Sequence, residues 1–340
     1  MLLIKNKHKF RRILIIQTAS IGDVILATPV IGQLHHNFPV AEIDFLLKKG
    51  IEGVFSGHPF LNEVLIWDKN HSKYRNYVKI IKAVRAKRYD LVINIQRFFT
   101  SGLITALSGA RYKAGFDKNP LSLTFTHKVK HVLGSKENPV HETSRNLLLI
   151  HAFCSPNQAA MKLYPAESDY LSVAEWTAEK YITISPASLW FTKQYPTEKW
   201  LELIQALDHT ISIYLLGSKA DANLCQELAS KAGRGRIENL AGKLTFLQSA
   251  ALMKSAVMNY VNDSAPMHLA SAVNAPVAVV FCSTVPEFGF GPLSDKSVII
   301  ETEEDLACRP CGLHGKKTCP EKHFKCAKSI GVEQLLKAME

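Results

Sequence analysis

One carboxylate, Asp23, lies where a buried strand of this chain is predicted to turn into a helix. An apolar run from Ile13 to Ile16 ends in small polar residues and Gly22, and a helical pattern follows. Ligands of open α/β sheets bind just outside the carboxyl ends of the strands. Asp23 is therefore predicted either to act on a ligand there or to cap the helix, whose N-terminus favours negative charge. The turn does not match the G-x-G-x-x-G dinucleotide fingerprint.

A loop in the second half, residues 185–196, also follows a predicted strand and carries several polar side chains. Lys193 of this loop can meet a phosphate as a mobile positive charge, and the hydroxyls of Ser188 and Thr192 can donate hydrogen bonds. The alternative is that Lys193 is an ordinary solvated loop lysine.

Two further loops precede predicted helices. Asp221 is predicted to cap its helix or to bind a ribose hydroxyl. In the other loop Asp263 or Ser264 is the predicted N-cap, and Pro266 fits the first turn. The free amides of that helix start form an anion site suited to a diphosphate. His268 lies one turn further, either as a ligand or as a satisfied core histidine.

Four of the seven cysteines form a cluster, Cys308-x2-Cys311-x7-Cys319-x6-Cys326, with His323 between the last two. In a cytosolic protein this spacing favours a structural metal over disulfides. Tetrahedral zinc takes four cysteines, or three cysteines and one histidine. The second pair lacks the x2 spacing, so structural zinc, free thiols and an oxidised pair all stay open. The remaining cysteines are predicted to be small core side chains: Cys154, Cys225 and Cys282.

The elements that position these residues alternate between strands and helices, which predicts parallel sheets covered by helices on both faces. In the first half the predicted strands are residues 12–17, 42–47, 63–67, 90–95, 111–115 and 127–131, and the helices 23–37, 73–87, 101–108 and 141–153. In the second half the strands are 181–184, 212–216, 256–261 and 277–281, and the helices 197–208, 221–231, 245–254 and 265–273. A last helix, 331–339, can pack on either domain.

The predicted fold class is therefore α/β, with two doubly wound domains. In chain order we expect an N-terminal domain (1–155), a linker (156–180), a C-terminal domain (181–327) that contains the cysteine cluster (308–326), and a C-terminal helix (328–340). A chain of 340 residues exceeds what one core usually supports. No run approaches the roughly 18 apolar residues that span a bilayer. The apolar run after the basic start is too short for a signal peptide, so a cytoplasmic location is expected.

The positive charge is concentrated in the first half. The net charge is +11, and residues 1–155 hold 23 Lys and Arg against 10 Asp and Glu. This asymmetry predicts an anionic partner: nucleic acid, a membrane surface or a phosphorylated glycolipid. For Lys79, Lys82 and Lys87, at helical spacing, an ordinary solvated face is the simpler interpretation. Nucleic acid is disfavoured because no nucleic-acid-binding motif and no basic groove with interleaved aromatics is present.

Three motifs occur in one order: Thr18-Ala19-Ser20-Ile21-Gly22-Asp23, then Lys193-Gln194-Tyr195-Pro196, then Asn262 to Leu269. Together they resemble the bacterial lipopolysaccharide heptosyltransferases, glycosyltransferase family 9, over essentially the whole chain. The cysteine tail also looks like one seen in a subset of that family. The resemblance implies a GT-B architecture, in which two Rossmann-like domains face each other across a cleft. It implies an acceptor on the N-terminal domain, ADP-heptose on the C-terminal domain, and no metal for the chemistry.

The resemblance also implies roles for single residues. Asp23 matches the family's catalytic aspartate and Lys193 its phosphate-contacting lysine. The remaining expected donor contacts are Ser188, Thr192, Asp221, Leu244 near the adenine, Asp263, Ser264, Ala265 and His268. The expected acceptor contacts are Ser20, Gly22 and Arg97. Two motifs depart from the family pattern: Asp-Thr-Gly is Asp263-Ser264-Ala265 here, and Lys-x-Trp-Pro is Lys193-Gln194-Tyr195-Pro196. These departures leave the donor's identity open.

The reaction expected from this resemblance is an inverting displacement by a monomeric enzyme. Asp23 accepts the proton of an acceptor hydroxyl, while Lys193 and the helix start near Ser264 stabilise the leaving nucleoside diphosphate. The basic first half is expected to hold an anionic glycolipid at the inner face of the cytoplasmic membrane. The alternatives are a sugar-nucleotide epimerase or hydrolase of the same fold, and a basic nucleic-acid-binding protein.

Overall fold

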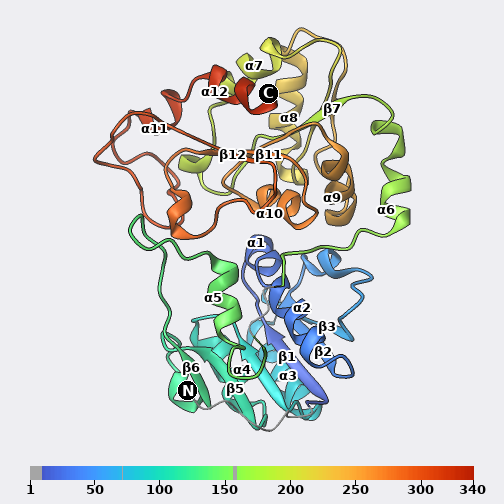
Figure 1. The fold of residues 1–340 in the computed structure, drawn as a ribbon, viewed down its shortest axis with the longest axis vertical. Coiled ribbons are helices and arrows are strands. Elements are labelled where there is room, and N and C mark those ends of the chain that lie inside the picture. The colour runs from blue at the N-terminus through green and yellow to red at the C-terminus, as the bar shows by residue number, and fades with distance from the viewer. Residues whose placement is uncertain (1–9, 71, 156–158) are drawn as a thin grey trace. The chain divides into compact units, whose positions relative to one another are not determined.

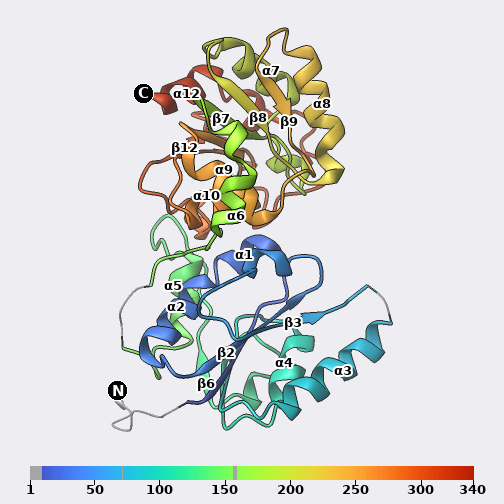
Figure 2. The same ribbon diagram turned by 90° about the vertical axis from the view of Figure 1, so that its right-hand side faces the viewer.

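The computed structural model describes residues 10–70, 72–155 and 159–340 (Figure 1). Within these residues the chain forms two compact units, of which the first ends at Lys162 and the second begins at Leu163. Each unit contains one six-stranded sheet whose neighbouring strands are all parallel. Parallel strands need crossover connections, which helices supply in both units (Figures 1 and 2).

The sheet of the first unit has the strand order β3-β2-β1-β4-β5-β6. Its strands are β1 (Arg12–Ile16), β2 (Glu42–Lys48), β3 (Glu63–Trp67), β4 (Leu91–Asn94), β5 (Tyr112–Phe116) and β6 (His127–Val129). Its helices are α1 (Ile21–Ile25), α2 (Thr28–Asn37), α3 (Lys73–Ala86), α4 (Phe99–Leu107) and α5 (Glu142–Leu148), with short 3-10 helices η1 (Glu52–Phe55) and η2 (Ser122–Thr124). Leu14 and Ile16 of the central strand pack with Ile80 and Val84 of α3. The central strand is apolar because helices that pack on the sheet bury its side chains.

The sheet of the second unit has the order β12-β11-β10-β7-β8-β9. Its strands are β7 (Tyr181–Ser185), β8 (Ser212–Leu215), β9 (Ile237–Asn239), β10 (Asn259–Asn262), β11 (Val277–Phe281) and β12 (Ser297–Glu301). Its helices are α6 (Glu167–Ser172), α7 (Thr197–Ala206), α8 (Ala222–Lys231), α9 (Phe246–Ser255), α10 (Ala265–Ala272), α11 (Lys325–Lys328) and α12 (Val332–Leu336). The 3-10 helices are η3 (Ala174–Trp176), η4 (Phe191–Lys193), η5 (Lys219–Asp221), η6 (Pro286–Phe288) and η7 (Lys337–Met339). Numbered within its own unit, this sheet has the same strand order as the first.

Each sheet has one point where the strand order reverses, and this point brings two loops to the same edge. In the first unit β1 and β4 are neighbours, with Ile16 opposite Asn94. In the second unit β7 and β10 are neighbours, with Ser185 opposite Val261. Because the strands are parallel, the loops that follow them leave at the carboxyl edge, where ligands of doubly wound sheets bind.

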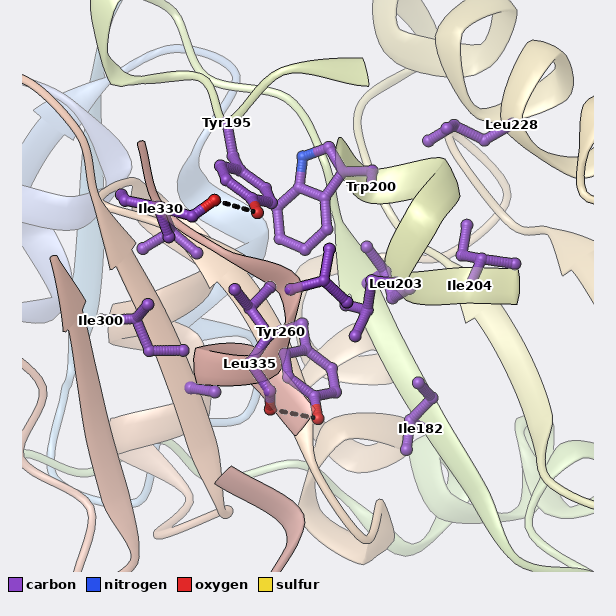
Figure 3. Packing of buried hydrophobic residues seen from close by; sticks show 14 of the residues in the cluster. Ile182, Tyr195, Trp200, Leu203, Ile204, Leu228, Tyr260, Ile300, Ile330 and Leu335 are labelled. Atoms are coloured by element: carbon purple, nitrogen blue, oxygen red, sulfur yellow. Dashed lines mark hydrogen bonds between the residues drawn. The ribbon is translucent and has the colours of Figure 1, made fainter. Parts of the chain in front are cut away.

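The C-terminal helices complete the core of the second unit (Figure 3). The Tyr195 hydroxyl donates to the carbonyl of Ile330 at 3.0 Å, and the Tyr260 hydroxyl donates to the carbonyl of Leu335 at 3.0 Å. Trp200 of α7 packs edge-on against the Tyr195 ring. The last helix, predicted to pack on either domain, therefore belongs to the second unit. The bond from Tyr195 to Ile330, which lies between α11 and α12, fixes the loop that carries Lys193.

The helix predicted over residues 23–37 is divided into α1 and α2. Pro29 has no N–H to donate to the carbonyl of Ile25, so a continuous helix would leave that acceptor without its bond. The Thr28 hydroxyl donates to the Ile25 carbonyl instead, at 2.7 Å. Pro29 then takes its favoured place in the first turn of α2. The predicted single helix is wrong at this proline.

The segment predicted as a linker, residues 156–180, is structured over much of its length. Residues 156–158 lie outside the described part, while α6 and η3 lie in the second unit. The indole N–H of Trp176 donates to Glu238 at 3.0 Å, which ties this segment to β9. Strands β9 and β12 were not predicted, because both are edge strands with short or half-buried apolar runs. No helix among the described residues is both long and apolar enough to cross a membrane.

Candidate functional site

Asp23 is held at the start of α1 by a reciprocal hydrogen-bond pair with Ser20. The Ser20 amide donates to Asp23 Oδ2 at 3.0 Å, the Ser20 hydroxyl donates to the same oxygen, and Ser20 is the N-cap of α1. The predicted capping role of Asp23 is therefore confirmed. The side chain is half-buried at the carboxyl edge of β1. Gly22, in the same turn, is buried.

A second carboxylate, Glu142, lies near enough to Asp23 for the two negative charges to interact. Glu142 binds the buried Arg145 through Nε at 2.8 Å and Nη2 at 2.5 Å. Burial raises the pKa of Glu142, and the Asp23 charge adds to the rise, while Arg145 and Arg97 oppose it. The sequence offered no motif for Glu142 and Arg145. Their grouping with Asp23 and Arg97 makes this edge of the first unit rich in charge.

Polar side chains also lie at the carboxyl ends of β1 and β4, on the same edge of the sheet. The Thr18 hydroxyl donates to Gln96 Oε1 at 2.7 Å, and Lys69 Nζ donates to the Thr18 carbonyl at 2.8 Å. Gln96 directly follows the predicted strand 90–95, so its place at the carboxyl edge could have been inferred from the sequence. The next residue, Arg97, is exposed. This edge therefore offers hydroxyl, amide and cationic groups to a polar ligand.

In the second unit Lys193 and Asp263 form an ion pair. Lys193 Nζ lies 2.6 Å from Asp263 Oδ2, and the two side chains are 14% and 8% exposed. The Thr284 hydroxyl donates to the same oxygen at 2.6 Å. Lys193 is therefore not an ordinary solvated lysine, because a carboxylate holds it at the point where β7 and β10 end.

Asn262, the last residue of β10, holds the loop that carries Lys193. Its Oδ1 accepts from the Tyr195 amide at 2.9 Å, and its Nδ2 donates to the Pro186 carbonyl at 2.8 Å. Both ends of the 186–195 loop are thus fixed by one buried amide. Asn262 lies in a motif that the sequence analysis singled out, but its role as a clamp follows from the structure.

Helix α10 begins directly beyond the ion pair. Ser264 is its N-cap with an extended backbone, and Pro266 is in the first turn, as predicted. Within the described residues the Ser264 side chain makes no capping hydrogen bond to the helix. Ala265 is half-buried at the first helical position, and His268 is buried one turn further. The start of α10 thus lies beside a lysine whose charge suits the same phosphate.

The segment that carries the first two clustered cysteines is bound to this site. The Thr192 hydroxyl accepts from the Lys316 amide at 2.7 Å and from the Ser283 hydroxyl at 2.9 Å. Gly315 has a φ of +76°, and a Cβ there would lie 2.9 Å from Lys193 Cγ. Residues 309–316 therefore form a strap, so named here, whose backbone lies directly against Lys193. Nothing in the sequence indicates that the cysteine tail and the lysine loop lie in contact.

Arg309 fixes the start of the strap. Its guanidinium donates to the carbonyls of Cys282 at 2.8 Å, Phe281 at 3.1 Å and Thr284 at 2.8 Å, and it pairs with Glu301. These bonds cover the end of β11 and the loop after it, in which Thr284 binds Asp263. One arginine thus connects the strap to the strand that supports the ion pair.

The seven cysteines, all within the described residues, are free thiols, and Cys154, Cys225 and Cys282 are buried as predicted. Burial raises the pKa of Cys326 to about 11, and the neighbouring Cys311, Cys319 and Cys308 add to the rise, so the four clustered thiols lie near one another. Among the described residues, however, no group of three or more His, Cys, Asp or Glu is arranged to hold a metal ion. The sulfur donors suit zinc but their arrangement does not fit it, and structural zinc stays a prediction.

Two of the other expected donor contacts, Asp221 and Ser188, are bound by residues of their own loops. Asp221 Oδ2 accepts from the Ser218 amide and hydroxyl, both at 2.7 Å, which is the capping role that the sequence allowed. The Ser188 carbonyl accepts from the Gln194 side chain at 2.6 Å. Leu244 is half-buried in the turn before α9. A ribose or adenine contact by these residues stays a prediction.

Comparison with known proteins agrees with this architecture. Residues 77–324 match the model of glycosyltransferase family 9 (heptosyltransferase). Lipopolysaccharide heptosyltransferase 3 of Escherichia coli K12 is 31% identical over 287 residues, which cover 77% of this chain and 80% of that protein. The solved structure of E. coli ADP-heptose lipopolysaccharide heptosyltransferase II matches with a TM-score of 0.78 at 21% identity, over 96% of this chain and 97% of that one. An E. coli heptosyltransferase solved with ADP matches with a TM-score of 0.74 at 21% identity, over 97% and 100%.

Two doubly wound units with polar loops at both switch points define the architecture of a GT-B glycosyltransferase. The chain belongs to glycosyltransferase family 9, the heptosyltransferases. It is accordingly a glycosyltransferase of lipopolysaccharide biosynthesis, and the resemblance identified from the three motifs is confirmed.

Proposed function

We propose that this enzyme transfers a heptose from ADP-heptose to the inner core of lipopolysaccharide, with inversion at the anomeric carbon. An acceptor hydroxyl attacks that carbon, its proton passes to Asp23, and the bond to the diphosphate oxygen breaks to release ADP. The solved relative bound to ADP and the relative named for ADP-heptose support the choice of donor. No step of this reaction uses a metal.

Asp23 is the proposed general base. Its Oδ2 accepts the bonds from Ser20, so the proposal assigns proton acceptance to Oδ1. A base positioned in this way contributes roughly 10²- to 10⁴-fold to the rate. The neighbouring Arg97 and Arg145, which interact with Glu142, keep this edge from becoming purely negative. The same cations suit an anionic acceptor, and Ser20, Gly22 and Arg97 are its proposed contacts.

The observation that carries the donor half of the proposal is the pair of Lys193 and Asp263 beside the start of α10. Negative charge develops on the diphosphate as ADP leaves. Lys193 and the free amides of the helix start stabilise that charge. Asp263 holds the lysine and is proposed, with Ala265 and His268, to contact the sugar and diphosphate.

The acceptor of such a reaction is an anionic glycolipid, and the proposed place of work is the inner face of the cytoplasmic membrane. The excess of Lys and Arg in the first half supports this part of the proposal. The enzyme reaches its acceptor as a peripheral protein, and ADP-heptose reaches the enzyme from solution.

The decisive experiment replaces Asp23 by Asn. Asparagine keeps an oxygen acceptor for the Ser20 bonds, so α1 still begins at the same residue, but the basicity is lost. The expected result is a fall of kcat by roughly 10²- to 10⁴-fold with ADP-heptose binding unchanged. Asp169→Asn is the matched control, since Asp169 accepts from the Ala166 amide at the start of α6 in the same way. A D23N enzyme within tenfold of the wild type contradicts the assignment of the base.

A donor-only assay separates transfer from other chemistry of the same fold. The wild type is expected to release little ADP from ADP-heptose unless a lipid A acceptor with its first core sugars is present. Turnover of the donor alone, with an altered or hydrolysed sugar as product, would contradict transfer. Two readouts are needed: the ADP formed with and without acceptor, and the identity of the sugar, since an epimerised donor releases no ADP.

A further inference from the structure

Helix α3 of the first unit exposes large apolar side chains next to cations. Tyr74 is 82% exposed and Val78, one turn later, is 50% exposed. Ile80 and Val84, on the other side of the helix, are buried against the sheet. A helix that buries one apolar face and exposes another needs a second partner to cover the latter.

Helix α4 adds aromatic side chains to the same surface. The Tyr77 hydroxyl donates to the Thr100 carbonyl at 2.6 Å, and Arg85 Nη1 donates to the Leu107 carbonyl at 3.3 Å. These bonds join both ends of α4 to α3, and the two helices lie side by side in Figure 2. Phe98 and Phe99, at the start of α4, are 62% and 54% exposed. The exposed apolar residues of both helices therefore form one surface, which we call the α3–α4 face.

The charges of the α3–α4 face are all positive. Arg75, Lys79 and Lys82 are exposed on α3 and form no ion pair within the described part of the chain. Helical spacing places them beside Tyr74 and Val78. Neither α3 nor α4 contains an aspartate or glutamate. Lys87, which follows α3, is different, because it pairs with Asp44 and Glu63.

We propose that the α3–α4 face docks the enzyme on the surface of an anionic lipid bilayer. Tyrosine and phenylalanine rings favour the boundary between headgroups and acyl chains. Arginine and lysine beside them bind anionic headgroups, while their aliphatic stems cover apolar surface. Charge complementarity therefore selects the occupant, since a protein partner would have to offer a broad acidic face with apolar residues at its centre.

The place of this face agrees with the proposed acceptor. Arg97, an expected acceptor contact, lies between β4 and Phe98, so the aromatic end of the face adjoins the carboxyl edge of the sheet. A glycolipid held in the bilayer would reach that edge without leaving the membrane. This part of the inference rests on the proposed function, whereas the docking itself does not.

Flotation of the full-length protein with lipid vesicles tests the docking. Vesicles of phosphatidylcholine alone are compared with vesicles that also contain phosphatidylglycerol, at low and high salt. The wild type is expected to float with the anionic vesicles and to be released by salt. Lys79→Glu/Lys82→Glu is expected to lower the partition coefficient by more than roughly 30-fold, the loss expected for removing two positive charges alone. Tyr74→Ser/Val78→Ser is expected to lower it at least about tenfold.

Two matched variants control for charge and apolarity elsewhere in the same unit. Lys128→Glu/Lys130→Glu changes the net charge equally at exposed positions of β6 and the residue after it. Val40→Ser/Leu123→Ser removes two apolar side chains that are exposed outside α3 and α4. Both controls are expected to float like the wild type. If Lys79→Glu/Lys82→Glu fails to fold, Lys79→Gln/Lys82→Gln takes its place with a smaller expected loss.

The vesicles contain no acceptor, so this experiment is independent of the transfer reaction. Transfer to a delipidated, water-soluble acceptor is measured separately and is expected to be unchanged in all four variants. Equal flotation of the α3 charge variant and its β6 control overturns the docking proposal, as does binding to neutral vesicles that salt does not affect. Retention by nucleic acid or by an acidic protein in place of vesicles overturns it as well. Absence of transfer by the wild type overturns the proposed function and leaves the docking result standing.

Discussion

The ammonium group of Lys193 lies 2.6 Å from the carboxylate of Asp263, and the two residues follow the neighbouring strands β7 and β10. The Thr284 hydroxyl binds the same carboxylate oxygen from the end of β11. Three loops of one sheet edge thus converge on one oxygen. The ion pair with Asp263 fixes the position of the Lys193 ammonium group. A diphosphate bound at this edge would therefore meet a positive charge that is already in place.

Replacing Lys193 by Met is expected to reduce both stability and donor use. The variant leaves the largely buried Asp263 carboxylate without its cation, at a cost of about 1–3 kcal/mol in the free energy of unfolding. Lys193→Met/Asp263→Asn is expected to recover part of that loss but none of the activity. Lys199→Met, which breaks a more exposed pair with Glu202, is the control and should cost less than about 1 kcal/mol. Urea unfolding and the KM for ADP-heptose are the measurements; equal stability of the two lysine variants would refute the coupling.

A methyl group at Gly315 is expected to disturb Lys193 from the strap side. Gly315→Ala introduces a Cβ that would lie 2.9 Å from Lys193 Cγ and 3.1 Å from Thr192 Oγ1, at a φ of +76°. Gly312→Ala is the matched control, because Gly312 has a similar φ of +82° but no heavy atom within 4 Å of the added Cβ. In both variants an alanine in the left-handed backbone region lowers the free energy of unfolding by about 1 kcal/mol. Only Gly315→Ala should also raise the KM for ADP-heptose. Identical kinetic constants for the two alanine variants would show that the strap does not position the lysine.

The sequence was sufficient to predict most of both sheets because their inner strands, such as β1, β4, β7, β10 and β11, are short, apolar and buried on both faces. The alternation of such runs with helical patterns indicates a doubly wound fold without any further information. Edge strands β9 and β12 escape this reasoning, since no residue of β9 and only Ile300 of β12 is fully buried, and their apolar patterns are weak. The division of the helix at Pro29 could have been predicted from the proline. That prediction also requires the Thr28 hydroxyl to replace the missing hydrogen bond to the Ile25 carbonyl.

The sequence around Asp23 and Asp221 does not distinguish a catalytic or binding carboxylate from one that caps a helix. Ser20 with Asp23 and Ser218 with Asp221 form the same capping arrangement at the same spacing, each after a strand. Spacing alone therefore gives both acids the same roles. What distinguishes Asp23 is its tertiary surroundings of Glu142, Arg145 and Arg97, which come from distant parts of the chain. The strap is a similar case, because nothing in the sequence near Gly315 indicates contact with Lys193.

Loss of Arg309 is expected to release the strap. Arg309→Met leaves three carbonyls and the Glu301 carboxylate without their donor, and a cost of about 2–4 kcal/mol in the free energy of unfolding follows. Arg309→Lys keeps the charge for Glu301 but cannot reach all three carbonyls, and should cost about half as much. Urea unfolding measures the stability, and ADP binding should weaken in the same order. A lysine variant less stable than the methionine variant would contradict this assignment.

The stability of the first unit is expected to depend on pH through His131. Burial, together with the nearby charges of Arg97 and Arg145, lowers the pKa of His131 from 6.5 to about 4. Between these two pH values the unfolded chain binds a proton that the folded chain does not, so the free energy of unfolding falls as the pH falls from 6.5 to about 4.

His131→Phe removes the titration while keeping a ring against Phe116, whose centroid is 4.9 Å from that of His131. In this variant the loss of stability between pH 6.5 and 4 should be smaller than in the wild type, by on the order of 1 kcal/mol after allowance for partial exposure. Urea unfolding at a series of pH values measures the slope, and His151→Phe controls for the exchange of an exposed histidine for phenylalanine. If the His131→Phe slope matches that of the wild type, His131 is not the group that links protonation to unfolding, and His58, whose pKa burial also lowers to about 4, becomes the one to replace next.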